Sequence, residues 1–250
     1  MRIWSLWFLS LALTLAQPGC NDTLPCLDLA VQPVDNTNRF LVNPRWTADG
    51  QQLILAGYQG VGSFCLDPST GHIDECGAAA VELHPVRAPD GTSGIPVAGA
   101  RVIKYDEYWG RLSVIDGDSE RELVEHAWGA RVSPTGDRVA FCTGHLYAAW
   151  LHVMTLDGKA EYSGPGAQPA WLPGGQRLVF SLPSGGPAGI DDSDLFLLDL
   201  GSGNTLRMTA TPEITEMQPA VSPCGKRLAW VDWRSGKPFI ARLGMPGGGS

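Results

Sequence analysis

The feature that most constrains this chain is a short motif that recurs five times along its 250 residues. Four copies align on a shared glycine: PRWTADGQQLIL from Pro44, ARVSPTGDRVAF from Ala130, PAWLPGGQRLVF from Pro169 and PAVSPCGKRLAW from Pro219. A degraded copy, PVRAPDGTSGIP, begins at Pro85. The third residue of each copy, which we call the anchor, is Trp46, Arg87, Val132, Trp171 or Val221, so successive spacings are 41, 45, 39 and 50 residues. This period predicts one supersecondary unit repeated around a common core.

Each copy has the residue types of a strand, a turn and a second strand. The proline that follows the first residue of most of these turns presets φ for the second turn position. An aspartate at the next position, as at Asp49, can bond nearby backbone amides. The shared glycine suits a position with φ above zero. The segment after it is rich in residues that favour strands, as in Leu53–Leu55 and Leu178–Phe180.

Further strand–turn–strand segments follow the copies, namely SFCLDPSTGHIDE, RLSVIDGDSEREL, LHVMTLDGKAEYS and SDLFLLDLGSGNTLRMT. Each unit therefore supplies about four short strands in roughly 40 residues, the size of one propeller blade. We predict an all-β chain that forms a β-propeller of about five four-stranded blades. The unit around Arg87 lacks an aromatic anchor and carries TSGIPVAG where a strand is expected, which predicts an irregular blade or a loop insertion.

These residues resemble the TolB-type propeller repeat, a bacterial relative of the WD-repeat blade. The copies at Pro169 and Pro219 match its pattern best, and DLFLLDLGSGNTLRMT joins them. The resemblance covers about residues 40 to 243. It implies an exported bacterial protein that acts through protein partners, as TolB does in the periplasm. This sequence departs from TolB in having no separate N-terminal α/β domain.

The last repeat leaves the closure of the ring open. After Pro219 only two or three strands fit before the chain reaches GMPGGGS. The segment Cys26–Pro33 has strand character and is a candidate for the missing outer strand, which would remove an exposed edge. The alternative is a chain that lacks further blades and leaves the ring open.

The first residues have the pattern of a secretory signal peptide. Arg2 precedes an apolar run from Ile3 to Ala16, which is too short for an ordinary transmembrane helix. Cleavage after Ala16 and cleavage before Cys20 both remain open. The second option would make Cys20 a lipidated first residue, although Gln17 stands where a lipobox prefers an aliphatic residue. We therefore expect residues 1–19 to be a signal peptide and residues 20–250 to be a single propeller of the cell envelope, periplasmic or lipid-anchored.

Export makes disulfides chemically accessible to the six cysteines. Cys65 and Cys76 flank a turn-rich stretch between two apolar runs and are the one pair that the sequence favours. If Cys20 carries a lipid, an odd number of thiols remains and at least one is unpaired. Cys224 stands where the repeat pattern carries aspartate, so we interpret it as a tolerated substitution at an exposed turn and not as a nucleophile.

Charge and motifs argue against several kinds of chemistry. A net charge of −8 does not suit a general nucleic-acid binder, which needs clustered Lys and Arg. The sequence contains no G-x-S-x-G elbow and no H-E-x-x-H motif. The acidic stretch Asp116–Glu122 lacks the glycine of a calcium loop and is interpreted as a hairpin tip, and Gly189–Phe196 as an Asp-rich loop before a strand. No catalytic, cofactor-binding or metal-binding residue is predicted.

These observations favour a non-enzymatic binding or scaffold module that presents propeller loops to a partner, expected to be a protein of the envelope. The alternative is a propeller-based enzyme such as a metal-assisted carbohydrate lyase. That alternative requires three or more of the five histidines to converge with carboxylates at one rim. The histidines are His72, His84, His126, His145 and His152. A third interpretation is a degenerate propeller that has kept no partner.

Overall fold

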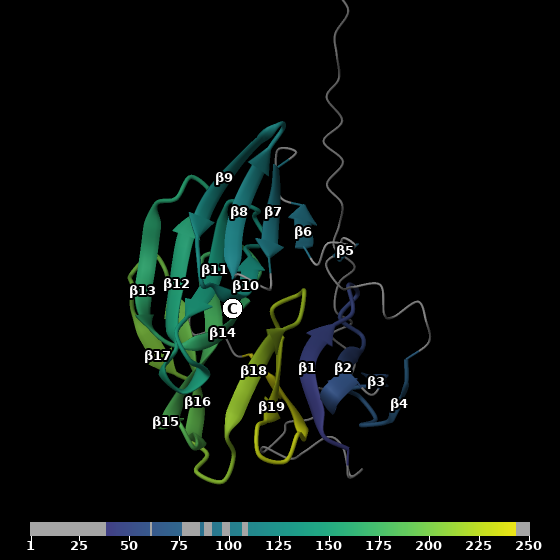
Figure 1. Ribbon diagram of the computed structural model, residues 1–250. Helices are drawn as coiled ribbons and strands as arrows, with labels where there is room; N and C mark the ends of the chain where they lie inside the picture. The colour runs from purple at the N-terminus through teal and green to yellow at the C-terminus, as the bar shows by residue number, and fades with distance from the viewer. Residues whose placement is uncertain are drawn as a thin grey trace, which may run out of the picture.

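The computed structural model describes residues 39–60, 62–76, 86–87, 92–96, 101–106 and 110–243. They form antiparallel sheets that follow one another along the chain, each built from consecutive strands (Figure 1). Two short 3-10 turns, η1 (Tyr58–Gly60) and η3 (Leu146–Ala148), are the helical segments of this described part.

Three of the sheets have four strands. The first contains β1 (Leu41–Trp46), β2 (Leu53–Gly57), β3 (Ser63–Leu66) and β4 (Ile73–Glu75). The third contains β10 (Trp128–Val132), β11 (Arg138–Thr143), β12 (Trp150–Thr155) and β13 (Ala160–Pro165). The fourth contains β14 (Ala167–Trp171), β15 (Arg177–Gly186), β16 (Gly189–Asp199) and β17 (Thr205–Arg207).

The second and fifth sheets differ from this plan. The second has five strands: β5 (Val86–Arg87), β6 (Thr92–Pro96), β7 (Arg101–Asp106), β8 (Arg111–Asp116) and β9 (Ser119–Val124). The fifth has three described strands: β18 (Glu216–Val221), β19 (Arg227–Asp232) and β20 (Pro238–Arg242). The degraded repeat thus forms an irregular sheet, as its sequence predicts. The segment Cys26–Pro33, expected to complete the last blade, lies outside the described residues.

The repeated motif forms the same turn in four sheets. The first turn residue, at position 47, 133, 172 or 222, donates its backbone N–H to the carbonyl five residues later at 2.9 Å. The shared glycine, three residues after that first residue, donates its N–H back to it at 2.8 to 3.2 Å. That glycine has φ between 66° and 72° in each case, a conformation that disfavours residues with a Cβ. The sequence prediction of this turn is confirmed.

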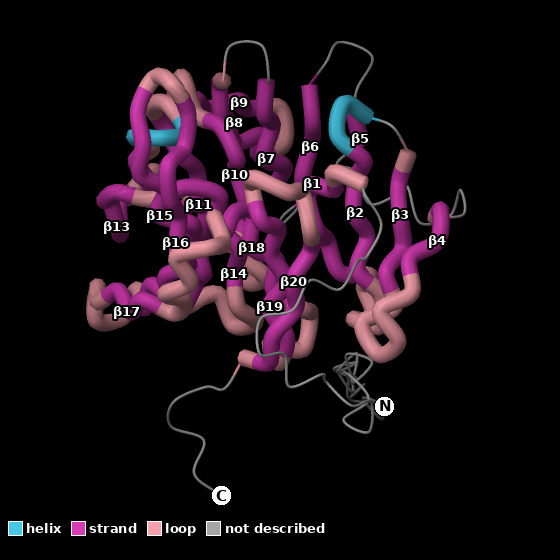
Figure 2. Tube along the Cα trace, turned by 90° about the horizontal axis from the view of Figure 1, so that it is seen from below, coloured by secondary structure: helices cyan, strands magenta, loops and turns pink. Residues whose placement is uncertain are grey.

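The sheets are arranged as the blades of a β-propeller. In Figure 2 the first strand of each well-described sheet lies toward the middle, whereas β4, β13 and β17 lie at the periphery. Each inner strand also has an irregular register ahead of its anchor, around positions 43, 129, 168 and 218. Asn43, Gly129, Gln168 and Gln218 all have φ between 52° and 64° at these bulges.

Neighbouring sheets are joined by a tryptophan hydrogen bond that recurs. Trp171 Nε1 donates to the carbonyl of Arg131 in the preceding sheet at 2.9 Å. Trp46 Nε1 donates to the carbonyl of Ala220 at 3.0 Å. Arg131 and Ala220 both come directly before an anchor, so the two bonds are equivalent in the repeat. The first and last sheets therefore meet in the way that two consecutive sheets do.

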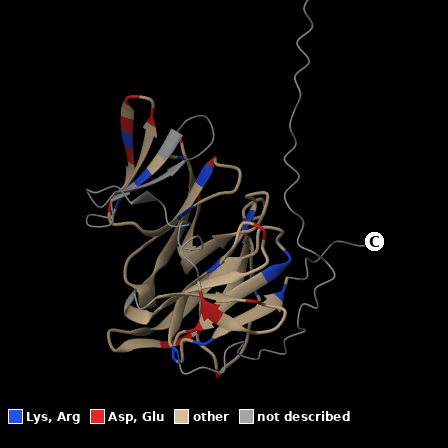
Figure 3. Ribbon diagram, turned by 90° about the vertical axis from the view of Figure 1, so that its right-hand side faces the viewer, with Lys and Arg blue, Asp and Glu red and all other residues tan. Residues whose placement is uncertain are grey.

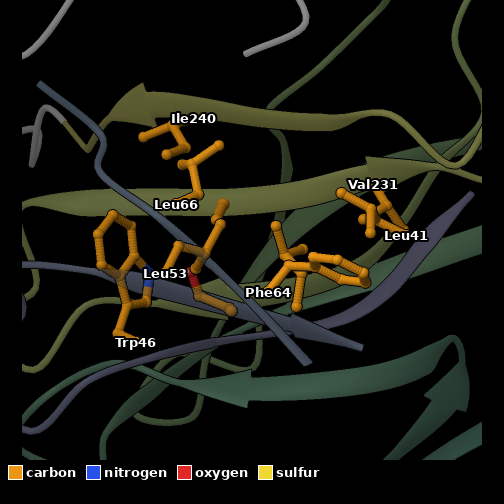
Figure 4. Packing of buried hydrophobic residues seen from close by; sticks show 10 residues of the cluster. Leu41, Trp46, Leu53, Phe64, Leu66, Val231 and Ile240 are labelled. Atoms are coloured by element: carbon orange, nitrogen blue, oxygen red, sulfur yellow. Dashed lines mark hydrogen bonds between the residues drawn. The ribbon is translucent and has the colours of Figure 1, made fainter. Parts of the chain in front are cut away.

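This contact between the first and last sheets, which we call the seam, is also apolar. Figure 4 shows Leu41, Trp46 and Phe64 of the first sheet packed beside Val231 and Ile240 of the last. Burial of these side chains supplies the main stabilising term, at roughly 25 cal/mol per Å² of apolar surface removed from water. The backbone joins in, because Leu41 N donates to the carbonyl of Gly236 at 2.9 Å.

We predict that Gly236→Ala weakens the seam. Gly236 has φ +67°, and an added Cβ would lie 2.7 Å from the Cα of Phe40. Backbone at that distance must shift, which adds about 1 to 3 kcal/mol to the cost of the unfavourable φ alone. Urea unfolding measures the loss.

Gly203→Ala is the matched control. Gly203 has φ +70° and closes a turn of the same kind, but a Cβ there meets no atom within 4 Å. If both variants lost the same free energy of unfolding, the contact between Gly236 and Phe40 at the seam would contribute nothing to stability.

Candidate functional site

The turns of the repeat surround a pocket at one end of the inner strands. The pocket has a volume of about 450 Å³ and lies between the third, fourth and fifth sheets and the anchor of the first. We call it the turn-side pocket. Its lining residues are Trp46, Pro134, Thr135, Trp171, Pro173, Gly174, Val221, Ser222 and Pro223. None of these side chains carries a charge, and three are prolines from equivalent turns.

The turns are brought together by close contacts at their glycines. A Cβ on Gly175 would lie 2.5 Å from Thr135 Oγ1 of the preceding turn, and one on Gly225 would lie 3.1 Å from Pro173 Cδ. Only glycine allows the turns this approach while keeping φ above zero. The residues that define the repeat therefore also shape the wall of the pocket.

The inner strands below the pocket are linked by side-chain amides. Gln168 Oε1 accepts the backbone N–H of Gln218 at 2.9 Å, and Gln218 Oε1 accepts that of Asn43 at 2.7 Å. The donors are bulge residues, where the register of pairing with the next strand of the same sheet is interrupted. These bonds fix the spacing of the fourth, fifth and first sheets around the centre and so make the pocket wall rigid.

The four described histidines do not gather. His72 pairs with Asp74 at the surface, and His145 stacks on Tyr147. His126 has φ +58° before the third inner strand. Within the described ranges, no group of three or more His, Cys, Asp or Glu side chains is placed to hold a metal ion. His84 lies outside those ranges.

His152 takes part in a polar network on the third sheet. Its Nε2 lies 2.9 Å from Thr143 Oγ1 and its Nδ1 lies 3.1 Å from Ser163 Oγ. Trp150 Nε1 donates to the same Ser163 oxygen at 2.7 Å. That hydroxyl can then donate to Nδ1, which leaves the Nε2 proton for Thr143. Burial lowers the pKa of His152, which favours this neutral form.

Glu216 is a buried acid that the sequence did not single out. It is the first residue of β18, has no exposed surface, and leaves Oε2 without a hydrogen-bond partner. Thr211 donates its hydroxyl to Oε1. Burial raises the pKa of Glu216 to about 7, opposed by the Thr211 bond and reinforced by the charges of Asp194 and Asp192. Glu216 stands at the end of β18 away from the turn-side pocket.

Both acidic stretches belong to antiparallel hairpins. Asp116 and Ser119 are the paired ends of β8 and β9, as the hairpin interpretation predicts, and Lys104 and Arg111 form ion pairs with Glu120 and Glu122. Figure 3 shows such charged positions scattered among uncharged ribbon.

The interpretation of Gly189–Phe196 as a loop is wrong. The whole segment belongs to β16, which pairs with β15 along nearly its full length. Arg207 holds Asp194 at 2.5 Å, and Arg234 donates to the carbonyl of Asp191. The Arg207 pair lets the strand accommodate the Asp194 carboxylate, and the local sequence does not show this partner.

The tryptophans divide between core and surface. Trp46, Trp171 and Trp230 are buried between sheets, which confirms that repeat positions build the core. Trp128 donates to the carbonyl of Gly144 at 2.8 Å. Trp150 is a large aromatic side chain on the surface of the third sheet, with 45% of its area exposed. Trp109 lies outside the described residues.

The described cysteines have three different environments. Cys65 and Cys76, the pair that the sequence favours, are joined by a disulfide. Cys142 is a free, buried thiol, and burial raises its pKa to about 12. Cys20 and Cys26 lie outside the described residues.

Cys224 is half-buried and disulfide-bonded, with a partner that is not among the described residues. Its interpretation as a tolerated substitution at an exposed turn is therefore wrong. Comparison of the repeats identifies the turn, but it cannot identify a covalent partner elsewhere in the chain.

No protein-family model and no curated protein matches the chain. Among solved structures, the β-propeller domain of Cps50 (Swd1) from Myceliophteria thermophila is similar at 12% identity and a TM-score of 0.49, over 82% of this chain and 84% of that one. An Agrobacterium tumefaciens protein assigned as TolB is similar at 13% identity and a TM-score of 0.44, over 85% and 93%.

A third similar structure is a prolyl endopeptidase, at 18% identity and a TM-score of 0.47 over 61% of this chain. This chain spans 28% of the length of that enzyme. Similarities at this level carry no argument about function, and the propeller fold rests on the sheets and joints described above. In the described part of the chain, no helix is long and apolar enough to cross a membrane.

We predict that Glu216→Gln changes how stability depends on pH. The pKa of Glu216 is raised in the folded state, so the native protein holds a proton that the unfolded chain loses, and stability falls as pH rises from about 4.5 to about 7. Glutamine stays neutral and keeps the acceptor for Thr211. The variant should match the parent near pH 4.5 and exceed it by one to a few kcal/mol at pH 8, at roughly 1.4 kcal/mol per pKa unit.

Urea unfolding of both proteins at several pH values measures this difference. Four aspartates have lowered pKa values in the folded protein, namely Asp49, Asp67, Asp137 and Asp199. Their protonation lowers stability only under more acidic conditions. It does so equally in parent and variant, so it does not affect the difference between them. A constant difference between parent and variant across this range would refute the buried-acid assignment.

Proposed function

We propose that this protein is a non-enzymatic binding module of the bacterial cell envelope, and that the turn-side pocket receives an extended segment of a protein partner. The observation that carries the proposal is the uncharged pocket formed by Trp46, Trp171 and three turn prolines. Its volume lies in the range of sites for small ligands or a few residues of peptide. A folded partner would contact the rim and insert only a short segment.

The chemistry of the wall suits such a segment. Proline and tryptophan present flat apolar faces, and their rigidity lowers the entropy lost on binding. The hydroxyls of Thr135 and Ser222 and the backbone of Gly174 add polar groups to the wall. Propellers hold their loops on a rigid ring, which matches the fixed turns and amide links seen below this pocket.

The alternative of a metal-assisted lyase has no observation in its favour among the described residues. The histidines lie apart, and the buried acid Glu216 stands at the far end of its strand from the pocket. We therefore retain the binding module as the function that the geometry supports best.

A photo-crosslinking amino acid at position 135 tests the partner proposal in the native envelope. Thr135 is exposed at the pocket rim, so a bound segment should give one defined adduct there. Pro134→Arg places a long charged side chain at the same rim and should reduce that adduct at least tenfold.

Pro212→Arg is the matched control, because Pro212 is an exposed proline in the turn that precedes β18, at the other end of that strand. It should leave the adduct unchanged. Adduct formation that is insensitive to Pro134→Arg, or equal from a crosslinker at position 212, would exclude the turn-side pocket as the binding site.

We further propose that the chain is exported and that Cys20 is a candidate for lipid attachment. Cys224 needs a disulfide partner, and Cys65, Cys76 and Cys142 are otherwise accounted for. A lipid on Cys20 would leave Cys26 as the one thiol available to Cys224.

Cys20→Ser should then release the protein from the membrane fraction while leaving the Cys224 disulfide intact in non-reducing peptide mapping. Cys26→Ser is the comparison variant and should leave membrane partition unchanged. Unaltered membrane partition of Cys20→Ser would remove the lipid anchor.

A further inference from the structure

Arg227 carries a buried charge at the seam. It is the first residue of β19 and is only 4% exposed. Its Nη1 donates to the carbonyl of Gly50 at 3.3 Å, and its guanidinium carbon lies 5.8 Å from the centre of the Trp46 ring. In the described ranges no carboxylate lies within ion-pair distance of it. A guanidinium has five N–H donors, and burying its charge without an anion is costly.

The equivalent arginines of two other sheets have carboxylate partners. Arg138 and Arg177 begin β11 and β15 as Arg227 begins β19. Arg138 Nε lies 2.6 Å from Glu161 Oε2, and Arg177 Nε lies 2.7 Å from Asp199 Oδ2. Both arginines are more exposed than Arg227. The third and fourth sheets therefore supply an anion to this position themselves, and the fifth sheet, where the arginine is most buried, has no such pair among its described strands.

The residue opposite Arg227 is a second arginine. In the fourth sheet, Arg177 is paired in register with Asp199 of the next strand. In the fifth sheet, the corresponding partner of Arg227 is Arg242 on β20. Arg242 is exposed and forms no ion pair with any described residue. Like charges directly opposite each other in an antiparallel pair are destabilising, so this pair lacks a compensating charge of its own.

Both arginines face the first sheet. The neighbouring pair on the same side of the strands is Ala229 and Ile240, and both belong to the apolar cluster of the seam. Side chains two residues apart on a strand point to the same face, so Arg227 and Arg242 continue this face toward the turns. The bond from Arg227 to Gly50 agrees with that placement.

The acid of the facing turn does not neutralise them. Asp49 lies in the turn that contains Gly50, and its Oδ1 accepts the hydroxyl of Thr47 at 2.5 Å and the N–H of Gln51 at 2.9 Å. It forms no ion pair with either arginine. An oxyanion from outside the chain would provide the charge that carboxylates provide in the third and fourth sheets.

The arginine pair adjoins the turn-side pocket. Ser222, which lines the pocket, donates its N–H to the carbonyl of Arg227 at 2.9 Å and accepts the Arg227 N–H on Oγ at 3.0 Å. Trp46 lines the same pocket and contacts the Arg227 guanidinium. Strands are about 4.8 Å apart, so Arg242 lies two strands, or about 10 Å, outward from Ser222. An extended segment spans that distance in about three residues.

We propose that Arg227 and Arg242 bind an oxyanion at the turn side of the seam, and that this oxyanion is a carboxylate side chain of the segment that occupies the turn-side pocket. The second part rests on the proposed function. A guanidinium presents paired N–H groups that match two oxygens of a carboxylate or phosphate, and such charge-assisted bonds are stronger where water is partly excluded. The acidic residue would lie about three positions from the residue held in the pocket.

The first test measures binding of inorganic phosphate to the purified protein by calorimetry, in a chloride buffer of low ionic strength. The parent should bind phosphate. Arg242→Gln removes one guanidinium, and Arg227→Lys replaces paired donors by a single ammonium, so each should weaken binding by about fivefold or more. Arg234→Gln is the matched control, because Arg234 is an exposed arginine in the turn at the other end of β19. It should leave the affinity unchanged.

A thermal unfolding curve separates loss of binding from loss of fold. Arg242 is exposed and opposes Arg227, so Arg242→Gln should unfold at the temperature of the parent or above it. Absence of phosphate binding by the parent would overturn the oxyanion site. Parent-like affinity in both Arg242→Gln and Arg227→Lys would overturn it as well.

The second test identifies the source of the oxyanion. The probes are acetyl-Phe-Pro-Gly-Glu-amide and the same peptide with glutamine in place of glutamate. The parent should bind the glutamate peptide about tenfold more tightly, and Arg242→Gln should lose most of that preference. Equal affinity for the two peptides, with phosphate still bound, would overturn the assignment to the partner segment and leave a site for a free anion. Neither test needs the native partner, so crosslinking at position 135 can fail while both succeed, and the reverse.

Discussion

The hydrogen bond from the indole of Trp46 to the carbonyl of Ala220 is the contact on which the rest of this molecule depends. It joins residues 174 positions apart and brings the first sheet against the last. Without that seam, Leu41 and Phe64 would lose the apolar partners that bury them. The turn-side pocket would also lose Trp46, the lining residue that the first sheet contributes. A bond of this kind contributes only about 1 kcal/mol by itself, but it fixes the place where a much larger apolar surface is buried.

The sequence was sufficient for the parts of the fold that are local and repeated. Strand, turn and glycine follow from residue types within twelve positions, and Gly136 and Gly225 adopt the predicted φ. The irregular second sheet was also foreseeable, because Arg87 breaks the repeat. The failures have one cause in common. Cys224 and Asp194 of β16 each have a partner distant in sequence, a cysteine outside the described residues in one case and Arg207 in the other.

The candidate site was less predictable than the fold. The prolines that line the pocket were visible as turn residues, but nothing local shows that equivalent turns meet around one cavity. Glu216 was missed for a related reason. The equivalent position in the first, third and fourth sheets holds Leu41, Ala127 or Gly166, so a search for the shared pattern discards Glu216. A comparison that asks where these copies disagree would have found this acid.

The bulges on the inner strands have a consequence for how the ring is assembled. Gln168 accepts from Gln218, and Gln218 accepts from Asn43, so the same amide link serves a joint inside the chain and the joint between its first and last sheets. The hydrogen bonds between inner strands are therefore of the same kind at the joint between the first and last sheets as at a joint inside the chain. A circularly permuted chain that begins with the fifth sheet and ends with the fourth would keep the same joints between sheets. Its fifth and first sheets would be linked by the backbone, and its fourth and fifth sheets would be held by side-chain contacts of the kind now seen at the seam.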